Sequence, residues 1–312
     1  MGKVCVGVDV GGTTVKLGLF EVDGQLMDKW EIPTRTEDGA KHILPDIAES
    51  VKAKLAEKDI DLSEVVGAGM GIPGPVLANG MVTQCVNLGW KEKNAQKELS
   101  ELLGVPVKSG NDANVAALGE MWQGGGKGFH DIVMVTLGTG VGGGIILNEK
   151  IWTGEQGVGG EIGHIHVMEG EKEACNCGGH GCLEQVASAT GIARTARRML
   201  AADNRPSTLR SLKNISAKNV LDAAKAGDAL ALESLNKSCY YLGWALATIS
   251  MVLDPQAFLI GGGVSKAGTF LTDIIKRYHD ELSPMATKKA DIVLAKLGND
   301  AGIYGAAKLI IG

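Results

Sequence analysis

The stretch Val4-Cys5-Val6-Gly7-Val8-Asp9-Val10-Gly11-Gly12-Thr13-Thr14 decides the expected fold of this chain. Its first seven residues are apolar except for Gly7 and Asp9, which predicts a buried strand. The glycines and threonines that follow predict a tight turn, and residues 15–20 have the alternating character of a second strand. We therefore expect an antiparallel hairpin with an acidic side chain beside its turn.

The same pattern returns after the glycine-rich segment 124–128. An apolar run over 131–137 leads into Gly138-Thr139-Gly140 and then into a second strand-like run over 144–147. Later, the strand and glycine loop of 65–74 are repeated by 257–260 and Gly261-Gly262-Gly263. Between the two halves of the pattern, helical periodicity over 42–58 puts residues 43, 47, 51 and 55 on one face, and a short strand is expected at 105–107. Two α/β lobes built this way would enclose an interlobe cleft lined by backbone N–H groups, a setting that suits a nucleotide. The alternative is one open sheet that carries all of these strands.

Both glycine turns are candidates for binding phosphate. Glycines let the backbone approach an anion, threonine hydroxyls donate hydrogen bonds, and an acid beside the turn can hold Mg²⁺ directly or through water. A plain tight hairpin is the alternative explanation for either turn taken alone. The candidate residues are Asp9, Gly11, Gly12, Thr13, Thr14 and Lys16 in the first half, and Gly138, Thr139 and Gly140 in the second.

Two other nucleotide-binding classes are excluded by what surrounds these glycines. Residues 138–143 match GxGxxG, but the following residues 145–150 predict a strand and a turn, whereas a dinucleotide-binding motif requires a helix there. The pattern GxxxxGK[ST] is absent, because Gly126-Lys127 is followed by Gly128. The sequence therefore argues against an NAD enzyme and against a P-loop ATPase.

Asp112 is the candidate catalytic base. The run Asn111-Asp112-Ala113-Asn114 opens a predicted helix, and the helix dipole favours an ionised carboxylate at that end. Such a carboxylate can accept the proton of a hydroxyl whose oxygen attacks a γ-phosphoryl group in line. An ordinary helix N-cap is the structural alternative for the same residue.

Three cysteines crowd into eight residues, Cys175, Cys177 and Cys182, a spacing typical of a metal site. His164 is the preferred fourth ligand, with His166 and His180 as alternatives. Four protein ligands would make the zinc structural, and it would place Glu161, Glu184 and the free nitrogen of His164 around a polyol. The alternative is a set of reduced cysteines without a metal.

Composition limits the partners and the compartment. The 312 residues carry 31 Lys and Arg against 36 Asp and Glu, so the formal net charge is 31 − 36 = −5. No basic run offers a footprint for nucleic acid. The start of the chain has too little apolar sequence for a signal peptide, and no apolar segment is long enough to span a membrane, so we expect a cytoplasmic protein.

Taken together, these motifs resemble the family of repressors, open reading frames and kinases (ROK), whose members have the two-lobed, actin-like ATPase fold of hexokinase. The resemblance covers nearly the whole chain, from Asp9 to the closing segment 297–307. It implies ATP binding by Asp9, Gly12, Thr13 and Lys16, by Thr139, and by an adenosine loop at Gly261, Gly262 and Gly263. It also implies zinc binding by His164, Cys175, Cys177 and Cys182, and sugar binding by Asn111, Asp112, Glu161, His164 and Glu184, with Asn87 as a weaker candidate from Asn87-Leu88-Gly89-Trp90.

The resemblance implies an ATP- and Mg²⁺-dependent kinase that phosphorylates the 6-hydroxyl of a hexose, with glucose the leading substrate. Kinases of N-acetylmannosamine or fructose share every motif quoted, and a sugar sensor without catalysis or a zinc hydrolase are further alternatives. The expected lobes are 1–122 with 299–312, and 123–298. A DNA-binding domain is not expected, because the first strand starts at residue 4, and the resemblance implies a homodimer or homotetramer.

Overall fold

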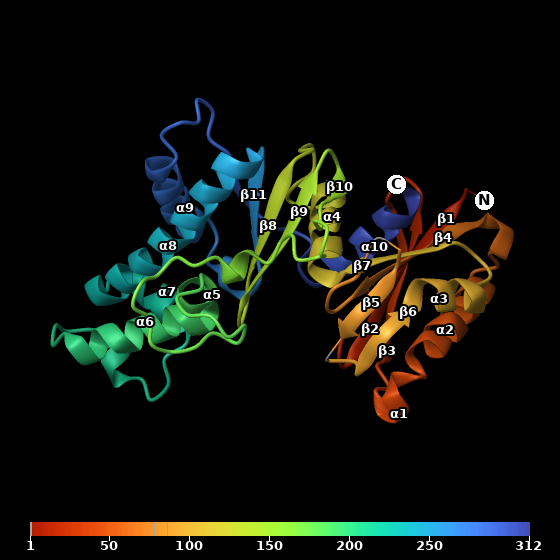
Figure 1. The fold of residues 1–312 in the computed structure, drawn as a ribbon, viewed down its shortest axis with the longest axis horizontal. Coiled ribbons are helices and arrows are strands. Elements are labelled where there is room, and N and C mark those ends of the chain that lie inside the picture. The colour runs from red at the N-terminus through yellow and green to blue at the C-terminus, as the bar shows by residue number, and fades with distance from the viewer. Residues whose placement is uncertain (1, 78, 86) are drawn as a thin grey trace. The chain divides into compact units, whose positions relative to one another are not determined.

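A computed structural model describes residues 2–77, 79–85 and 87–312, and its contacts divide the chain into two compact units (Figure 1). Unit 1 comprises Met1–His130, Gly144–Gly159 and Leu297–Gly312, and unit 2 comprises Asp131–Gly143 and Gly160–Lys296. The segment Gly144–Gly159 belongs to unit 1, where Gly144 lies against Ala113 and Ala117. Each unit contains a mixed α/β architecture.

The sheet of unit 1 confirms the expected opening hairpin. Its strand order is β3-β2-β1-β4-β7, in which β1 pairs antiparallel with β2 and parallel with β4. Asp9 near the end of β1 lies opposite Lys16 of β2, which places both beside the turn. The strand expected at 105–107 lies instead at 107–111. The bounds are β1 Val4–Val10, β2 Thr14–Glu21, β3 Leu26–Pro33, β4 Val65–Ile72 and β7 Val107–Asn111.

Alternation along β1 separates the two faces of this sheet. Its even-numbered valines, Val4 to Val10, belong to a large core with α2 and α3, whereas Cys5 packs with Ile303 and Ala307 of α10. The predicted helical face of α2, residues 43, 47, 51 and 55, is buried in the large core. The helices are α1 Glu37–Ala40, α2 Ile43–Glu57, α3 Ala95–Leu103, α4 Asp112–Gln123 and α10 Ala301–Ile311, and β5 Met81–Cys85 pairs with β6 Trp90–Asn94.

The second sheet repeats the connectivity of the first, as the sequence pattern predicted. Its order is β10-β9-β8-β11-β12, and β11 is the parallel neighbour of β8 just as β4 is of β1. Its strands are β8 Ile132–Leu137, β9 Val141–Leu147, β10 Lys150–Ile151, β11 Ala257–Gly261 and β12 Asp291–Leu294. The turn at 138–140 connects β8 to β9, so the phosphate-binding candidates lie where a strand ends.

Helices and short 3-10 turns make up most of the rest of unit 2. The longest helix, α8, has 25 residues, and no helix in the described parts of the chain combines the length and apolar character needed to cross a membrane. The helices are α5 Glu184–Ala187, α6 Ala189–Ala202, α7 Ala217–Lys225, α8 Ala229–Leu253 and α9 Thr269–Leu282. The loop between β10 and α5 carries the cysteine cluster.

Candidate active site

The first glycine turn of unit 1 is held in shape by Thr34, which follows β3. The Gly11 N–H donates to the Thr14 carbonyl at 3.0 Å, and the Thr34 hydroxyl donates to the Gly11 carbonyl at 2.7 Å. The Thr34 N–H donates to the Thr13 carbonyl at 2.9 Å, while Gly12 and Thr13 themselves are exposed. These bonds keep the backbone of the turn rigid and leave its tip accessible to an anion.

Asp9 is a half-buried carboxyl in a strongly perturbed environment. Burial, and then the nearby charge of Asp112, raise its pKa to about 6, while Lys16 acts in the opposite direction. Gly302 at the start of α10 lies directly against this carboxylate, where any side chain would collide with it. The Lys16 ammonium donates to the Asn299 carbonyl at 3.2 Å. Two acids that oppose each other's ionisation fit a divalent cation, which would favour the charged form of both.

The structure places Asp112 at the first position of α4 rather than at its N-cap. The cap is Asn111, whose side-chain oxygen accepts from the N–H groups of Ala113 and Asn114 at 3.0 and 3.2 Å. Asp112 accepts from the Ala113 N–H at 2.8 Å and from the Asn111 amide at 3.0 Å, both on the same oxygen, Oδ1. Capping alone therefore does not explain the acid, because Asn111 performs that function.

Asn87 is exposed in the turn between β5 and β6. Cys85, two residues earlier, has a pKa raised by burial and, to a smaller extent, by the charge of Asp112. This turn therefore lies within electrostatic reach of Asp112, although Asn87 itself makes no side-chain hydrogen bond that ties it to Asn111 or Asp112 among the bonds resolved in the described residues.

In unit 2 the second glycine turn and the expected adenosine loop lie side by side. The turn is closed by the Gly138 N–H, which donates to the Gly140 carbonyl at 3.0 Å. Gly262 has a φ of +82° and packs against the backbone of Leu137, so that a side chain there would come within 2.5 Å of the Leu137 carbonyl oxygen. Only glycine allows this approach, which brings Gly261–Gly263 next to the turn at 138–140, the second candidate for binding phosphate.

The cysteine cluster contains four potential ligands. The donor atoms of His164, Cys175, Cys177 and Cys182 all lie within 4.8 Å of one another. Cys177 Sγ and Cys182 Sγ are 3.6 Å apart, and so are Cys175 Sγ and His164 Nδ1. Tetrahedral zinc with bonds near 2.3 Å to sulfur and 2.0 Å to nitrogen would give edges of about 3.8 and 3.6 Å. The residues present therefore fit zinc.

Neither of the alternative histidines belongs to the group of four donors. His166 Nδ1 lies 2.8 Å from the His180 carbonyl oxygen, and His166 Nε2 lies 3.3 Å from Glu169. His180 is exposed and lies outside the group of four donors. Burial raises the pKa of Cys182 to about 12 and also raises that of Cys175, whereas the Gly179 N–H lowers the pKa of Cys177. A bound cation would be needed to keep all three thiols ionised.

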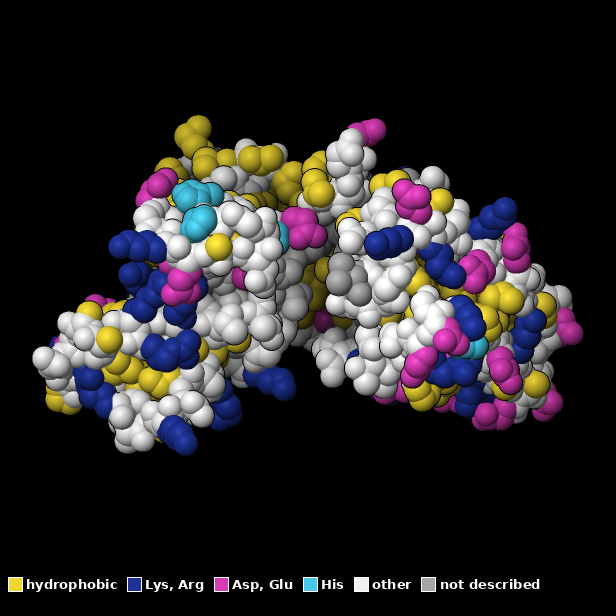
Figure 2. Space-filling view, turned by 60° about the horizontal axis from the view of Figure 1, so that its bottom comes forward, with side chains coloured by type: hydrophobic (Ala, Val, Ile, Leu, Met, Phe, Trp, Pro, Cys, Tyr) yellow, Lys and Arg dark blue, Asp and Glu magenta, His cyan; other side chains and the backbone are white. Residues whose placement is uncertain are grey.

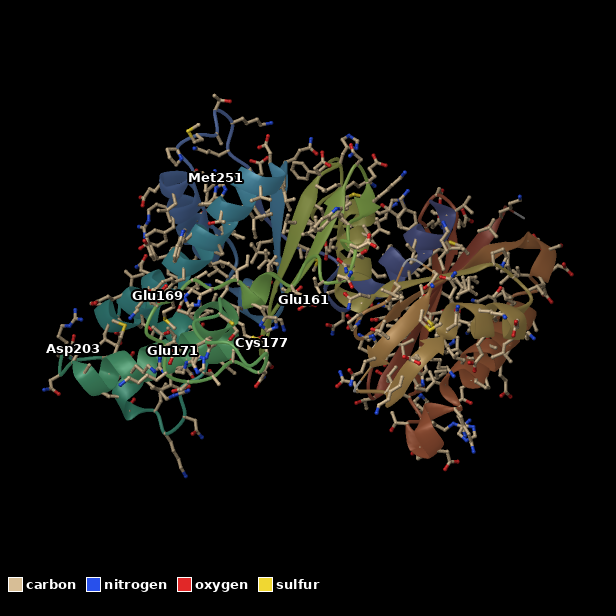
Figure 3. The ribbon with its side chains drawn as sticks, in the orientation of Figure 1. Glu161, Glu169, Glu171, Cys177, Asp203 and Met251 are labelled. Atoms are coloured by element: carbon tan, nitrogen blue, oxygen red, sulfur yellow. The ribbon has the colours of Figure 1, made fainter. Side chains whose placement is uncertain are left out.

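Two of the proposed sugar-binding acids, both in unit 2, lie around this cluster. Glu184 Oε2 accepts from the Val141 N–H at 3.2 Å, and its Oε1 lies 3.6 Å from the Cys175 thiol. On the other side, Glu161 Oε2 is 4.0 Å from His164 Nε2, the nitrogen that does not face the cysteines. Figure 3 shows Glu161 and Cys177 on the loop that leads from β10 to α5. The structure thus brings together Glu161, His164 and Glu184.

Three residues that support these groups were not identified from the sequence. Gly302 lies inside the closing segment 297–307, which was part of the resemblance, but nothing in the sequence assigned this glycine a function. Thr34 lies twenty positions after the turn that it holds, and no local pattern links the two. Gln185 follows Glu184 directly, and it holds the knuckle by accepting from the Cys182 N–H at 3.1 Å and donating to the Glu173 carbonyl at 2.9 Å.

Comparison with known proteins identifies the family. The ROK family model matches residues 5–312. The chain belongs to the ROK family. This ROK protein is 43% identical to a glucokinase from Halalkalibacterium halodurans over 310 residues, covering 98% of this chain and 94% of that one.

Solved structures of other ROK proteins have the same fold. A ROK hexokinase from Thermus thermophilus matches with a TM-score of 0.81 and 29% identity, over 97% of this chain and 96% of that chain. A ROK glucokinase from Streptomyces griseus, solved with glucose and AMPPNP, matches with a TM-score of 0.72 and 32% identity over 98% of both chains. The actin-like ATPase fold expected for this ROK protein is confirmed.

Substituting Asp9 with Asn should stabilise the free protein at alkaline pH. The folded protein holds the Asp9 proton more tightly than the unfolded chain does. The pKa of this carboxyl is 3.8 in the unfolded chain and about 6 in the folded protein, so its contribution to stability falls as the pH rises through this range. We expect Asp9→Asn to raise the free energy of unfolding at pH 8 by about 2 kcal/mol, and by less at pH 4.5. Urea unfolding at both pH values measures this.

The matched control is Asp61→Asn. Asp61 is exposed, and hydrogen bonds from Ser63 lower its pKa, so its removal should give no gain at pH 8. A loss of stability in Asp9→Asn at pH 8 would contradict the assignment of Asp9 as a destabilising charge held in place for binding.

Proposed function

We propose that this ROK protein is a glucokinase, which transfers the γ-phosphoryl group of ATP to the 6-hydroxyl of glucose. The observation that carries the proposal is the position of Asp112, an acid at a helix N-terminus whose N-cap is already supplied by Asn111. The glucokinases from Halalkalibacterium halodurans and Streptomyces griseus support glucose as the substrate.

In the proposed reaction Asp112 is the general base. Its carboxylate lies at the positive end of the α4 dipole and accepts hydrogen bonds on Oδ1, both of which stabilise the ionised form. An ionised carboxylate can take the proton of the 6-hydroxyl as that oxygen attacks the γ-phosphorus and the bond to the β-phosphate oxygen breaks. The products are glucose 6-phosphate, ADP and a proton that Asp112 returns to solvent.

The phosphate groups of ATP are assigned to the two glycine turns. In unit 1, the backbone and hydroxyls of Gly11, Gly12, Thr13 and Thr14, together with Lys16, would donate to phosphate oxygens. In unit 2, Gly138, Thr139 and Gly140 would do the same, and Gly261, Gly262 and Gly263 would lie against the nucleoside. Asp9 is the residue assigned to Mg²⁺, an ion that neutralises charge developing on the transferred group.

The assignment of zinc to His164, Cys175, Cys177 and Cys182 gives the metal a structural function. Four protein donors fill a tetrahedral ion, and no position is left for an activated water, which removes the basis for a zinc hydrolase. Glu161, Glu184 and His164 Nε2 would accept or donate hydrogen bonds to the hydroxyls of the sugar, with Asn87 and Asn111 as further candidates. Fixed polar partners discriminate strongly against analogues that lack one hydroxyl.

A coupled assay that detects ADP tests the function directly. The purified protein should form ADP only when ATP, Mg²⁺ and a sugar are all present, with the highest kcat/KM for glucose in a panel that includes N-acetylmannosamine, N-acetylglucosamine, mannose and fructose. A higher kcat/KM for another sugar would reassign the substrate and leave the mechanism standing. Sugar binding without any turnover would instead support a sensor.

Replacing Asp112 with Asn should reduce kcat by roughly 10²- to 10⁴-fold, because the amide cannot take the hydroxyl proton. Glucose affinity should change little, since Asn has nearly the same shape and can still accept from the Ala113 N–H. Steady-state kinetics and calorimetric titration with glucose measure the two effects. Asp222→Asn on the exposed surface of α7 is the control, and turnover retained in Asp112→Asn would remove Asp112 from this function.

Replacing Cys177 with Ser should lower zinc content and glucose affinity together, because the knuckle holds the loop that carries Glu161 and His164 and the start of α5, where Glu184 lies. Atomic absorption and glucose titration of the same sample measure both. Asn176→Ser changes the neighbouring residue, which is not a donor, and should retain zinc. Normal glucose affinity in a zinc-free Cys177→Ser protein would separate the metal from the sugar site.

A further inference from the structure

The first turn of α6 is bonded to the phosphate turn of unit 2. The Ala189 N–H donates to the Gly138 carbonyl at 2.8 Å, and the Thr190 hydroxyl donates to the Thr139 carbonyl at 2.7 Å. Ser188, the N-cap of α6, lies 2.9 Å from the Thr190 hydroxyl through its own oxygen, which limits the rotation of the threonine side chain. The carbonyls of the two peptide groups on either side of Thr139 are thereby fixed by one helix.

One and two turns further along α6, the same face carries Arg194 and Arg198. Residues at i, i+4 and i+8 lie above one another on a helix, so Thr190, Arg194 and Arg198 form one row. Arg194 Nη1 donates to Glu173 at 2.7 Å, and Arg198 donates to Glu171 at 2.7 and 3.1 Å and to Glu173 at 2.7 Å. Figure 2 shows Lys and Arg side chains gathered on the α6 part of unit 2.

The two acids belong to the loop that leads into the knuckle. Glu173 precedes Cys175 by two residues, and Figure 3 shows Glu171 and Cys177 on this loop. The Glu171 side chain is only 3% exposed, and its hydrogen bonds with Arg198 lower its pKa to about 2. Arg194 also donates to the Gln185 carbonyl, and Gln185 in turn accepts from the Cys182 N–H. The row therefore holds the knuckle through contacts that do not involve the metal.

A single cavity of about 320 Å³ in unit 2 is lined by residues from all of these parts. Its walls include Thr139, Gly140, Cys175, Glu184, Thr190 and Arg194. The phosphate turn and the knuckle thus face one space, and Thr190 and Arg194 of the row are among the α6 residues in its wall. A shift of either part along α6 would change the separation of the two.

We propose that Thr190, Arg194 and Arg198 are positioning residues, which hold the phosphate turn and the metal knuckle at a set separation along α6. Thr190 acts on the nucleotide through Thr139, and the two arginines act on the sugar through the knuckle loop. The proposal rests on the proposed function for the identity of the two substrates. It adds residues whose effect passes through the turn and through the knuckle, and each effect should fall on a different substrate.

The effects on the two substrates can be told apart because each contact holds a different part of the site. Without its partner hydroxyl, the Thr139 carbonyl can rotate, and the N–H groups of the turn then lose their alignment with phosphate oxygens. Without Arg198, the knuckle loop loses its bidentate attachment at Glu171 and one bond at Glu173, so Glu184 and His164 are held less firmly, by the metal, Gln185, Arg194 and the Val141 N–H. The first change weakens nucleotide binding, and the second weakens sugar binding.

Thr190→Val tests the nucleotide arm, because Thr190 is exposed and valine has the same shape without the hydroxyl. We expect KM for ATP to rise about 3- to 10-fold, the effect of one lost hydrogen bond, with KM for glucose unchanged. Thr190→Ser keeps the hydroxyl and should restore KM for ATP to within about 2-fold. Thr248→Val is the matched control, because that hydroxyl also donates to a backbone carbonyl, Trp244 on α8, at 3.0 Å.

Arg198→Gln tests the sugar arm. KM for glucose should rise about 3- to 10-fold, with KM for ATP and zinc content unchanged. Arg198→Lys keeps the charge without the planar, two-pronged geometry of the guanidinium, so its KM for glucose should lie between those of the unmodified protein and Arg198→Gln. Should the uncompensated Glu171 prevent folding, the double variant Glu171→Gln with Arg198→Gln removes the buried charge and carries the same expectation. Arg205→Gln, which breaks exposed pairs with Asp203 and Glu233, is the control.

Calorimetric titration with MgADP separates this proposal from the proposed function, because it needs no turnover. If the unmodified protein phosphorylates no sugar, the proposed function fails, and weaker MgADP binding by Thr190→Val still supports the positioning of the turn. If the unmodified protein is active and Thr190→Val leaves both KM for ATP and MgADP affinity unchanged, the positioning proposal is overturned. Equal effects of either variant on both substrates would also overturn it.

Discussion

The carboxylate of Glu184 links two parts of unit 2 that are far apart in the sequence. One oxygen accepts the N–H of Val141, directly after the phosphate turn, and the other lies against the thiol of Cys175 in the knuckle. Gly140 passes so close to this carboxylate that a side chain there would occupy its position. One carboxylate therefore contacts both the turn and the knuckle, in addition to their separate attachments to α6.

Unit 1 has a constraint of a different kind, two acids whose charges oppose each other. Asp9 is half-buried and within the influence of Asp112, and Gly302 and Lys16 pack around it without removing the cost. Such an arrangement lowers the stability of the free protein and is retained where a cation or a substrate benefits from it. In unit 2 a buried acid is neutralised by an arginine, since the almost completely buried side chain of Glu171 is paired with Arg198.

Much of the fold was predictable because it depends on local patterns. The hairpin of β1 and β2, the buried face of α2 and the repeated strand and glycine loop at β11 follow from periodicity and turn residues. The last strand before α4 was placed too early, at 105–107 rather than 107–111, because Ser109, Gly110 and Asn111 have little strand propensity. Pairing with β4 makes them a strand in spite of that.

The candidate site was predictable to the same degree and for the same reason. A cysteine knuckle and an acid at a helix start are short-range signals that one sequence reveals. The supporting residues are not, because Thr34, Gln185 and Thr190 are common polar residues whose importance lies in which carbonyl or N–H they meet. No spacing in the sequence specifies those partners.

By itself, the sequence identified the candidates for the chemistry: the glycine turns, Asp112, and the three cysteines of the knuckle. Only the tertiary structure decided that Asn111 and not Asp112 caps α4, that His164 completes the group of four donors, and that α6 carries the attachments of both turn and knuckle. The physical reason is that secondary-structure propensity and the ability to bind a metal are properties of a single residue, whereas a hydrogen bond requires two residues that meet in space. Pairs separated by tens of residues exist only after the chain has folded.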